Sequence, residues 1–363
     1  MKLTRIAVGL VGPSALVLFS VSAHKPMADP PSFEVDPFWP QPLPNNWIIG
    51  QVSGVAVDSR DHIWIVHRPG SLTPTDAGAV QEPPISQCCV PAPPVIEFDQ
   101  AGNVVQAWGG PESFAGWPAS EHGIFVDHAD NVWIGGTSHV VLKFTRDGQQ
   151  LLQIGEFGST GGSSDRQLLG SPADIAVDPE TNEVYIADGY GNRRIIVFDA
   201  ETGEYVRHWG AYGNPPDDRE LAPYDPAVPP LESFRTPVHA VRLSRDGKVY
   251  VADRVNNRVQ VFFRDGEFLT EASIARSTLS MGSAWDIEFS PDVEQTYMYV
   301  TDGTNDKVWI LNRQDLEIVG QFGRSGRYAG QFHWVHSVAL DSQGNLYTGE
   351  VDTGQRVQRF VAN

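Results

Sequence analysis

The sequence predicts an all-β fold, a six-bladed β-propeller, on three observations. Six copies of one pattern follow one another along the chain at intervals of roughly 45 to 70 residues, a spacing typical of propeller blades. Apolar residues within each copy alternate with a period of two, as in β-strands, and no helical period accompanies them. The last copy supplies three strands at most, so we expect an N-terminal strand to close the ring.

The copy at residues 237–263 (PVHAVRLSRDGKVYVADRVNNRVQVFF) shows the pattern most clearly. Two short strands flank a polar turn at Ser244 to Lys248, and a third strand follows Arg254. The equivalent first-strand position of the six copies holds Ser53, His122, Ala173, His239, Trp285 and His336. Because the repeat spans nearly all of the chain, and one propeller accommodates this length, we assign residues 47–363 to a single propeller domain.

Residues 1–23 have the features of a signal peptide. Lys2 and Arg5 precede an apolar run that ends in the small residues Val21-Ser22-Ala23, which are typical of a cleavage site. An uncleaved anchor is the alternative interpretation. We therefore expect a periplasmic or secreted protein that has no membrane attachment once the signal peptide is removed. No other stretch is apolar enough to cross a membrane.

Residues 24–46 form a Pro-rich segment (HKPMADPPSFEVDPFWPQPLPNN). Its composition predicts an extended chain that lies across the surface without a core of its own. The exception is the stretch from Phe33 to Val35, which has strand-forming residues. We expect this stretch to complete the final blade, because a borrowed strand removes an exposed sheet edge.

Residues 70–93 interrupt the first blade between Arg68 and Pro94. A loop of this length on a compact blade is usually functional or disordered, and the sequence leaves its role open. It holds the only two cysteines, Cys88 and Cys89, whose adjacency excludes a disulfide framework. In an oxidising compartment they would form a vicinal disulfide, remain free, or pair between chains.

The charge of the chain excludes some classes of partner. There are 45 acidic and 26 basic residues, which give a formal net charge of -19 at neutral pH. This excess of negative charge argues against nucleic acid and against an anionic membrane surface as partners. An anionic ligand, such as a small-molecule carboxylate, would need a local cluster of cations.

Histidine occupies the equivalent first-strand position in every second copy. The innermost strands of a propeller lie side by side around the channel, so His122, His239 and His336 should point at the axis, about 120° apart. Three neutral imidazoles with one open position are typical of a catalytic zinc centre. Chance placement in three of six positions is the alternative, and we favour the zinc site.

Antiparallel pairing brings further side chains to the same face. The end of the second strand of a blade lies beside the start of its first strand, which places Arg68, Tyr190 and Arg254 around the predicted metal. Arginine binds a carboxylate through two bonds, and a tyrosine beside a cation can act as a base. Each arginine alone could equally be a solvated surface residue. His62 and His128 fall in hairpin turns at the opposite face, where we expect solvent exposure.

Several motifs together resemble one enzyme family. The stretches GQVSGVAVDSRDHIWIVHR, EHGIFVD, DGYGNRR, VADRVNNRVQVF and HSVALDSQGNLY look like those of the peptidyl-alpha-hydroxyglycine alpha-amidating lyases, which are six-bladed propellers of NHL-type repeats with a three-histidine zinc site. The resemblance covers essentially the whole chain beyond the signal peptide. NHL repeats alone are unspecific, whereas the three histidines together with the HR and DGY motifs are specific.

The resemblance implies roles for individual residues. It makes His122, His239 and His336 the zinc ligands. It makes Tyr190 the catalytic tyrosine, with Arg68 and Arg254 as active-site arginines.

The resemblance also implies a calcium ion in the channel. That ion would be held by backbone carbonyls that correspond to Val55 and Ile124. Its carboxylate ligand corresponds to Ser337, which has no carboxylate. Trp334 and Gly191 replace a methionine and a disulfide cysteine of the family, in or near its substrate pocket. Because of these departures, the resemblance supports the metal site but does not identify the substrate of this chain.

Three functions follow as hypotheses. The first is a zinc-dependent carbon-nitrogen lyase that cleaves an N-acyl or N-carbamoyl alpha-hydroxyglycine-like compound to an amide and glyoxylate. The second keeps the zinc and makes the protein an esterase or lactonase. The third is a non-enzymatic NHL propeller that binds a protein or glycan on one face. We favour the first.

Overall fold

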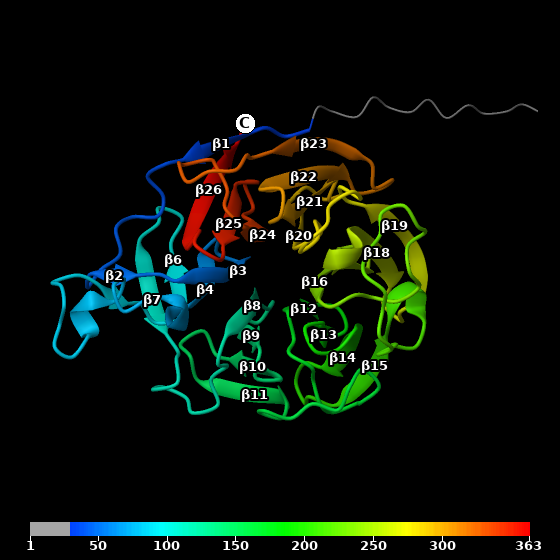
Figure 1. Ribbon diagram of the computed structural model, residues 1–363, viewed down its shortest axis with the longest axis horizontal. Helices are drawn as coiled ribbons and strands as arrows, with labels where there is room; N and C mark the ends of the chain where they lie inside the picture. Colours follow the sequence, from blue (N-terminus) through cyan, green and yellow to red (C-terminus); the bar gives the residue numbers. More distant parts are fainter. Residues whose placement is uncertain (1–29) are drawn as a thin grey trace, which may run out of the picture.

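The computed structural model describes residues 30–363, so the signal peptide predicted at residues 1–23 lies outside the described part of the chain. Six four-stranded antiparallel sheets surround a central channel (Figure 1). The predicted six-bladed β-propeller is therefore confirmed. The first strand of each repeat lies innermost, and successive strands step outward toward the rim.

The first three blades follow one another along the chain, and β5 lies outside the blade-1 sheet. Blade 1 consists of β3 (Gln51–Val57), β4 (Ile63–Arg68), β6 (Val95–Phe98) and β7 (Val104–Trp108). Blade 2 consists of β8 (Glu121–Val126), β9 (Val132–Gly136), β10 (Val140–Phe144) and β11 (Gln150–Gly155). Blade 3 consists of β12 (Asp174–Asp178), β13 (Glu183–Asp188), β14 (Arg194–Asp199) and β15 (Tyr205–Trp209).

The remaining blades repeat the arrangement, and the last one uses both ends of the chain. Blade 4 consists of β16 (Val238–Leu243), β17 (Lys248–Asp253), β18 (Arg258–Phe263) and β19 (Phe268–Ser273). Blade 5 consists of β20 (Ile287–Phe289), β21 (Tyr297–Asp302), β22 (Lys307–Asn312) and β23 (Ile318–Phe322). Blade 6 consists of β24 (Val335–Leu340), β25 (Leu346–Glu350), β26 (Arg356–Ala362) and the N-terminal strand β1 (Phe33–Asp36).

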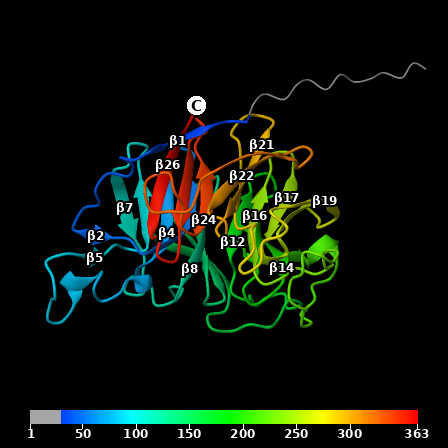
Figure 2. The ribbon, with the colours of Figure 1, turned by 45° about the horizontal axis from the view of Figure 1, so that its top comes forward.

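The closure of blade 6 matches the prediction for the Pro-rich segment. β1 pairs antiparallel with β26, with Phe33 opposite Ala362 (Figure 2). The ring of Phe33 packs 4.9 Å from that of Phe322 and 5.7 Å from that of Tyr299, measured between ring centroids. The N-terminal strand therefore supplies apolar packing to the last blade as well as backbone pairing.

The first-turn aspartates of the repeat fix the inner hairpins. One carboxylate oxygen of Asp58 accepts bonds from the backbone N–H groups of Arg60 and His62, and the other accepts a bond of 3.1 Å from the indole of Trp64. Asp127 binds the Trp133 indole in the same way, at 2.8 Å. An acidic turn followed by an aromatic strand is thus a local device that closes the hairpin and satisfies a buried indole N–H.

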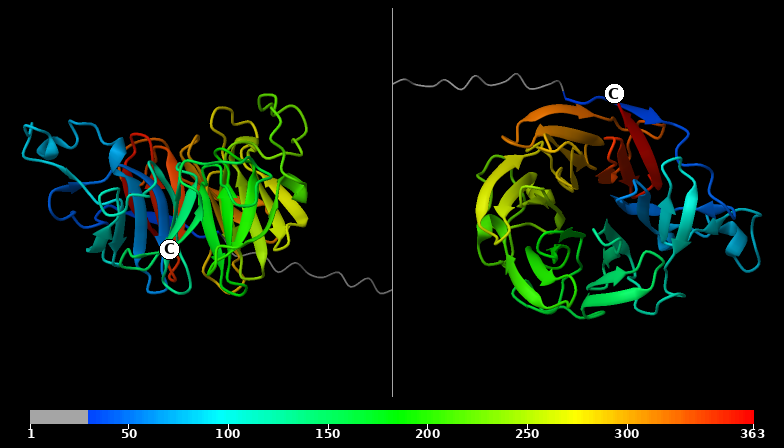
Figure 3. Two further views of the ribbon diagram at one scale, coloured as in Figure 1. Left: turned by 90° about the horizontal axis from the view of Figure 1, so that it is seen from below. Right: turned by 180° about the vertical axis from the view of Figure 1, so that it is seen from behind.

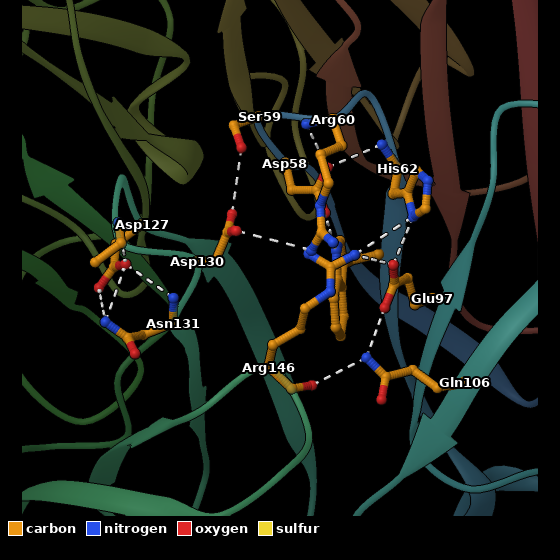
Figure 4. Close-up of polar contacts among 12 residues, drawn as sticks. Asp58, Ser59, Arg60, His62, Glu97, Gln106, Asp127, Asp130, Asn131 and Arg146 are labelled. Atoms are coloured by element: carbon orange, nitrogen blue, oxygen red, sulfur yellow. Dashed lines mark hydrogen bonds and ion pairs between the residues drawn. The ribbon is translucent and has the colours of Figure 1, made fainter.

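An arginine joins blades 1 and 2 at the hairpin end of the disc. The Arg146 guanidinium binds the carboxylates of Asp58, at 2.6 Å, and Glu97 (Figure 4). It also stacks on the Trp64 ring. His62 Nδ1 lies 2.6 Å from the Glu97 carboxylate. His62 is therefore half-buried and hydrogen-bonded, and the expectation that it is solvated was wrong, whereas His128 is exposed.

The segment that interrupts blade 1 lies at the rim, outside the ring of blades (Figures 1 and 3). It contains the 3₁₀ turns η1 (Pro69–Ser71) and η2 (Gly78–Val80) and the short strand β5 (Val90–Pro91). β5 pairs in parallel with β2 (Trp47–Ile48), which anchors the segment to the N-terminal region. Cys88 and Cys89 form a disulfide, so of the three alternatives the vicinal disulfide is observed.

Helical structure within residues 30–363 is limited to short 3₁₀ turns, which also include η3 (Ala211–Gly213) and η4 (Arg254–Asn256). None of the helices in this part of the chain is long and apolar enough to cross a membrane.

Candidate metal centre

The three predicted histidines meet on the channel axis. His122, His239 and His336 are buried at the starts of β8, β16 and β24, and their ring centroids are 4.7 to 5.0 Å apart. One ring nitrogen of each lies within 4.8 Å of those of the others. Each histidine sits at an irregularity in the pairing of its strand with the next one, where a bulge redirects a side chain.

Backbone carbonyls of neighbouring blades orient two of the rings. His122 Nδ1 lies 2.7 Å from the Ala173 carbonyl, and His239 Nδ1 lies 2.6 Å from the Trp285 carbonyl. A carbonyl only accepts, so both rings carry the proton on Nδ1 and expose the lone pair on Nε2. An outer contact of this kind is the usual support of a metal-ligating histidine.

Two imidazole nitrogens of the cluster lack a partner. His239 Nε2 and His336 Nδ1 are buried and have no hydrogen bond to any residue that the structure describes. A buried polar atom without a partner is costly, and a metal ion would satisfy His239 Nε2, because Nδ1 of that ring is already bonded to a carbonyl. The donor set therefore fits a zinc ion held by three imidazoles.

Burial keeps the three imidazoles neutral. It lowers the pKa of His122, His239 and His336 well below the usual value, and the nearby guanidinium groups of Arg68 and Arg254 lower each pKa further. A metal binds only the neutral form of imidazole. The same environment that disfavours protonation therefore prepares the cluster for a cation.

Tyr190 reaches the cluster from the loop after β13. Its hydroxyl oxygen lies 2.9 Å from His122 Nε2 and accepts a bond of 3.2 Å from Arg254 Nη1. The loop passes close to blade 4, where a side chain at Gly189 would lie 1.9 Å from the Val238 carbonyl oxygen. Asp188 anchors this loop, because it accepts hydrogen bonds from the Asn192 amide and from the backbone N–H of Gly170.

Arg254 lies beside the cluster at the first position of η4. It is 3% exposed, and its guanidinium stacks 4.4 Å above the Trp285 ring. Its Nε is buried and has no hydrogen-bond acceptor in the described part of the chain. Arg254 therefore retains an unused donor at the site, as a carboxylate-binding group requires. The Trp334 ring packs 5.5 Å from that of Trp285 and extends this wall.

Arg68 ends β4 on the other side of the cluster. Its Nε donates a bond of 2.7 Å to the Glu121 carbonyl, and its Nη1 donates one of 2.9 Å to the Gln51 amide oxygen. Burial lowers the pKa of Arg68 and raises that of the Glu121 carboxyl. Both contacts of the guanidinium are to neutral oxygens, so its positive charge is free to attract an anion.

The predicted calcium site does not fit the channel. Val55, Ile124 and Ser337 do line the space next to the histidines, but the buried guanidinium of Arg242 lines it as well. Arg242 Nη1 binds the carboxylate of Asp174, and Nη2 lies 3.3 Å from that of Asp286. The Arg242 guanidinium thus places a fixed positive charge where the calcium ion was predicted, and that charge would repel a second cation.

These channel carboxylates were missed in the sequence. Each also holds the next blade: Asp174 accepts a bond from the backbone N–H of Val241, and Asp286 accepts one from Val338. The repeat contained a signal for them. Three blades lack histidine at the first-strand position, and in two of them, blades 3 and 5, aspartate follows directly as Ala173-Asp174 and Trp285-Asp286.

Two other sets of possible metal ligands have structural roles instead. His67 is fully buried, accepts a bond from the Gly50 N–H at Nδ1 and lies 3.0 Å from the Pro93 carbonyl at Nε2, so no lone pair remains for a metal. The oxygen and nitrogen ligands of Asp58, His62 and Glu97 also cluster closely. The Arg146 guanidinium binds the two carboxylates of that group, which accounts for the cluster without an ion (Figure 4).

The chain matches the NHL repeat model over residues 169–198 and 238–262. It is 28% identical over 349 residues to peptidyl-alpha-hydroxyglycine alpha-amidating lyase 1 of Drosophila melanogaster, covering 89% of this chain and 58% of that protein. It is 26% identical to a probable lyase of the same name from Caenorhabditis elegans, covering 84% of this chain and 81% of that one. The resemblance that the motifs predicted is therefore confirmed.

Longer relatives share the same region. Peptidyl-glycine alpha-amidating monooxygenase B of Xenopus laevis is 26% identical over 340 residues, which cover 87% of this chain. The chain spans about a third of the length of that relative, 34%. Among solved structures, a streptogramin B lyase superposes with a TM-score of 0.56 and covers 91% of this chain and 98% of its own. At 12% sequence identity this likeness shows the fold alone.

Proposed function

We propose that this protein is a zinc-dependent carbon-nitrogen lyase. Its substrate would be an N-acyl or N-carbamoyl alpha-hydroxyglycine-like compound, and its products an amide and glyoxylate. One observation carries the proposal. The Tyr190 hydroxyl lies within hydrogen-bonding distance of both His122 Nε2 and Arg254 Nη1, beside three buried neutral imidazoles. The relatives named amidating lyases support the same reaction class.

His122, His239 and His336 would hold the metal. When bound, a zinc ion with an open position acts as a Lewis acid toward a substrate oxygen such as the alpha-hydroxyl. The side chains around the histidines would orient the substrate and transfer its proton.

The two arginines would orient the substrate. Arg254 has a buried, unpaired Nε, and Arg68 contacts only neutral oxygens, so both can bind the carboxylate of an alpha-hydroxy acid. Both guanidinium groups interact with Tyr190, so together they would hold that carboxylate beside the Tyr190 hydroxyl. The two guanidinium groups support a small-molecule carboxylate as the ligand, despite the net charge of -19 of the whole chain.

Tyr190 would move the proton. As a phenolate beside the charge of Arg254, Tyr190 would take the proton of the substrate hydroxyl and then hold it for the departing nitrogen. The electron pair left on the substrate oxygen forms the carbonyl of glyoxylate, the bond between the alpha-carbon and the amide nitrogen breaks, and the nitrogen receives the proton as the amide leaves. The atoms balance without water, oxidant or reductant, as a lyase requires.

We also infer export to the periplasm or outside the cell. The supporting observations are the predicted signal peptide at residues 1–23 and the disulfide between Cys88 and Cys89.

The test is a product assay with the zinc-loaded protein and alpha-hydroxyhippurate. Release of glyoxylate and benzamide in equal amounts is the expected result. A parallel screen with lactones and aryl esters identifies the hydrolase alternative, in which these are consumed and alpha-hydroxyhippurate is not. Absence of bound zinc after purification in zinc-supplemented buffer would favour the non-enzymatic scaffold.

A further inference from the structure

A large cavity lies between blades 1 and 2, next to the metal centre. Its volume is about 770 Å³, and six prolines line it, supplied by the segment that interrupts blade 1 and by the connection from β7 to β8: Pro69, Pro91, Pro93, Pro94, Pro111 and Pro118. Trp117 and Phe157 add aromatic surface. A space of this size lined mainly by apolar side chains is typical of a small-molecule site.

Two chain connections place the cavity beside the metal centre. Arg68 faces the histidines, and the next two residues, Pro69 and Gly70, line the cavity. His122 belongs to the triad, and the preceding Glu121 lines the cavity. Glu121 and His122 are the first two residues of β8, and consecutive residues of a strand point to opposite sides, so the cavity and the histidines flank the start of this strand.

The walls of the cavity are fixed in place. The buried His67 ring bonds to the Gly50 N–H and the Pro93 carbonyl, and the His67 N–H donates to the Pro94 carbonyl at 2.9 Å. The pairing of β2 with β5 holds the same wall from outside. A site formed in advance pays little ordering entropy when a ligand binds.

Trp117 forms the opposite wall. It is 4% exposed, its ring packs 5.7 Å from that of Phe144, and its indole N–H donates a bond of 2.6 Å to the Glu121 carboxylate. Gly109 permits this packing, because a side chain there would meet the Trp117 ring at 2.5 Å. Glu112 and Glu121 are the charged groups of the lining, so the cavity disfavours an anionic ligand.

We propose that this cavity binds the N-acyl group of the substrate, and that the group is uncharged, bulky and apolar, such as an aromatic or branched acyl chain. The inference rests on the proposed function, since it places the alpha-hydroxyglycine part at the histidines and the acyl part in the cavity, past the start of β8. The interrupting segment, whose role the sequence left open, is then a specificity element of the enzyme.

The experiment compares two substrates and one product in wild-type protein and in Ala115→Trp. Ala115 is an exposed residue of the lining, so the variant fills the cavity without disturbing the core. Ala227→Trp, in the exposed loop before β16, is the matched control. The substrates are alpha-hydroxyhippurate, with a benzoyl group, and N-acetyl-alpha-hydroxyglycine, and benzamide is the product.

We expect the wild type to favour the benzoyl substrate in kcat/KM by at least about tenfold. Ala115→Trp should abolish that preference through a higher KM for the benzoyl substrate and weaken benzamide binding measured by calorimetry. The Ala227→Trp control should match the wild type. Equal kcat/KM for the two substrates in the wild type, or benzamide binding that Ala115→Trp leaves intact, would overturn the inference.

The benzamide titration separates this inference from the proposed function. Benzamide binding that is lost in Ala115→Trp, in a protein that forms no glyoxylate, would retain the cavity as an apolar binding site and reject the lyase activity. Glyoxylate formation with no acyl preference would retain the lyase and reject the role of the cavity.

Discussion

The hydroxyl oxygen of Tyr190 lies 2.9 Å from Nε2 of His122, the nitrogen that also points toward the two other histidines of the channel. The base proposed for the reaction and a proposed metal ligand are thus in direct contact, although they come from different blades. The first prediction concerns the hydroxyl group that makes this contact.

Tyr190→Phe should lower kcat by about 10²- to 10⁴-fold, the usual contribution of a positioned proton-transfer group. The ring that packs on His122 is retained, so the zinc content and the melting temperature should stay at wild-type values. Steady-state kinetics with alpha-hydroxyhippurate and elemental analysis of the same preparation test both statements. Full activity in the variant would exclude Tyr190 as the base.

His239→Ala should abolish stoichiometric zinc binding. The variant removes one of three ligands and leaves a site that His122 and His336 cannot complete. Elemental analysis after dialysis measures the loss, and the chelator dipicolinate should lower the melting temperature of the wild type but not of the variant. His128→Ala, at an exposed hairpin turn, is the matched control and should keep its zinc.

Arg254→Lys should raise KM for alpha-hydroxyhippurate by at least about tenfold, because a lysine cannot provide the planar pair of donors that a carboxylate accepts. Benzamide, the product that has no carboxylate, is the matching control ligand. The wild type and the variant should bind it equally. An unchanged KM would place the carboxylate on Arg68 alone.

Arg242→Met should destabilise the protein by about 3–5 kcal/mol, because it leaves Asp174 and Asp286 buried without their cation. Chemical denaturation measures this loss. Calcium should raise the melting temperature of the variant, in which the carboxylates are unpaired, and should leave that of the wild type unchanged. A wild-type protein that loses stability in a calcium chelator would contradict the absence of a channel calcium site.

His67→Gln should flatten the acid limb of the stability curve. Burial lowers the pKa of His67 to about 4 from 6.5, so between these values the unfolded chain binds a proton that the folded protein does not. Wild-type stability attributable to His67 is therefore present above pH 6.5 and falls as the pH drops to 4, by about 3 kcal/mol. Glutamine can keep both hydrogen bonds without titrating. Urea denaturation at several pH values, with His128→Gln as control, measures the difference.

The register of the repeat made the blades, the closing strand and the histidine cluster predictable. Once Ser53, His122 and the equivalent positions were aligned, strand alternation and radial symmetry determined which side chains share the channel. The positions of Arg68, Tyr190 and Arg254 followed from antiparallel pairing, which is also a local rule.

The features that escaped prediction depend on contacts between blades. Arg242 meets Asp174 and Asp286 from blades on either side, and His62 meets Glu97 from a strand further out in its own blade. The interrupting segment has no repeat partner, so its position at the rim depends on the pairing of β2 with β5. Side-chain packing across such distances has no period in the sequence that would reveal it.

The pairing of β1 with β26 also has a kinetic consequence. These strands are the most distant in sequence of all the paired strands in residues 30–363, so their contact carries the largest loop-closure entropy in the fold. We expect blade 6 to be the last to form during folding. Until β1 docks, the outer edge of β26 is free to pair with a strand of another molecule, so a chain that lacks β1 should associate in a concentration-dependent manner.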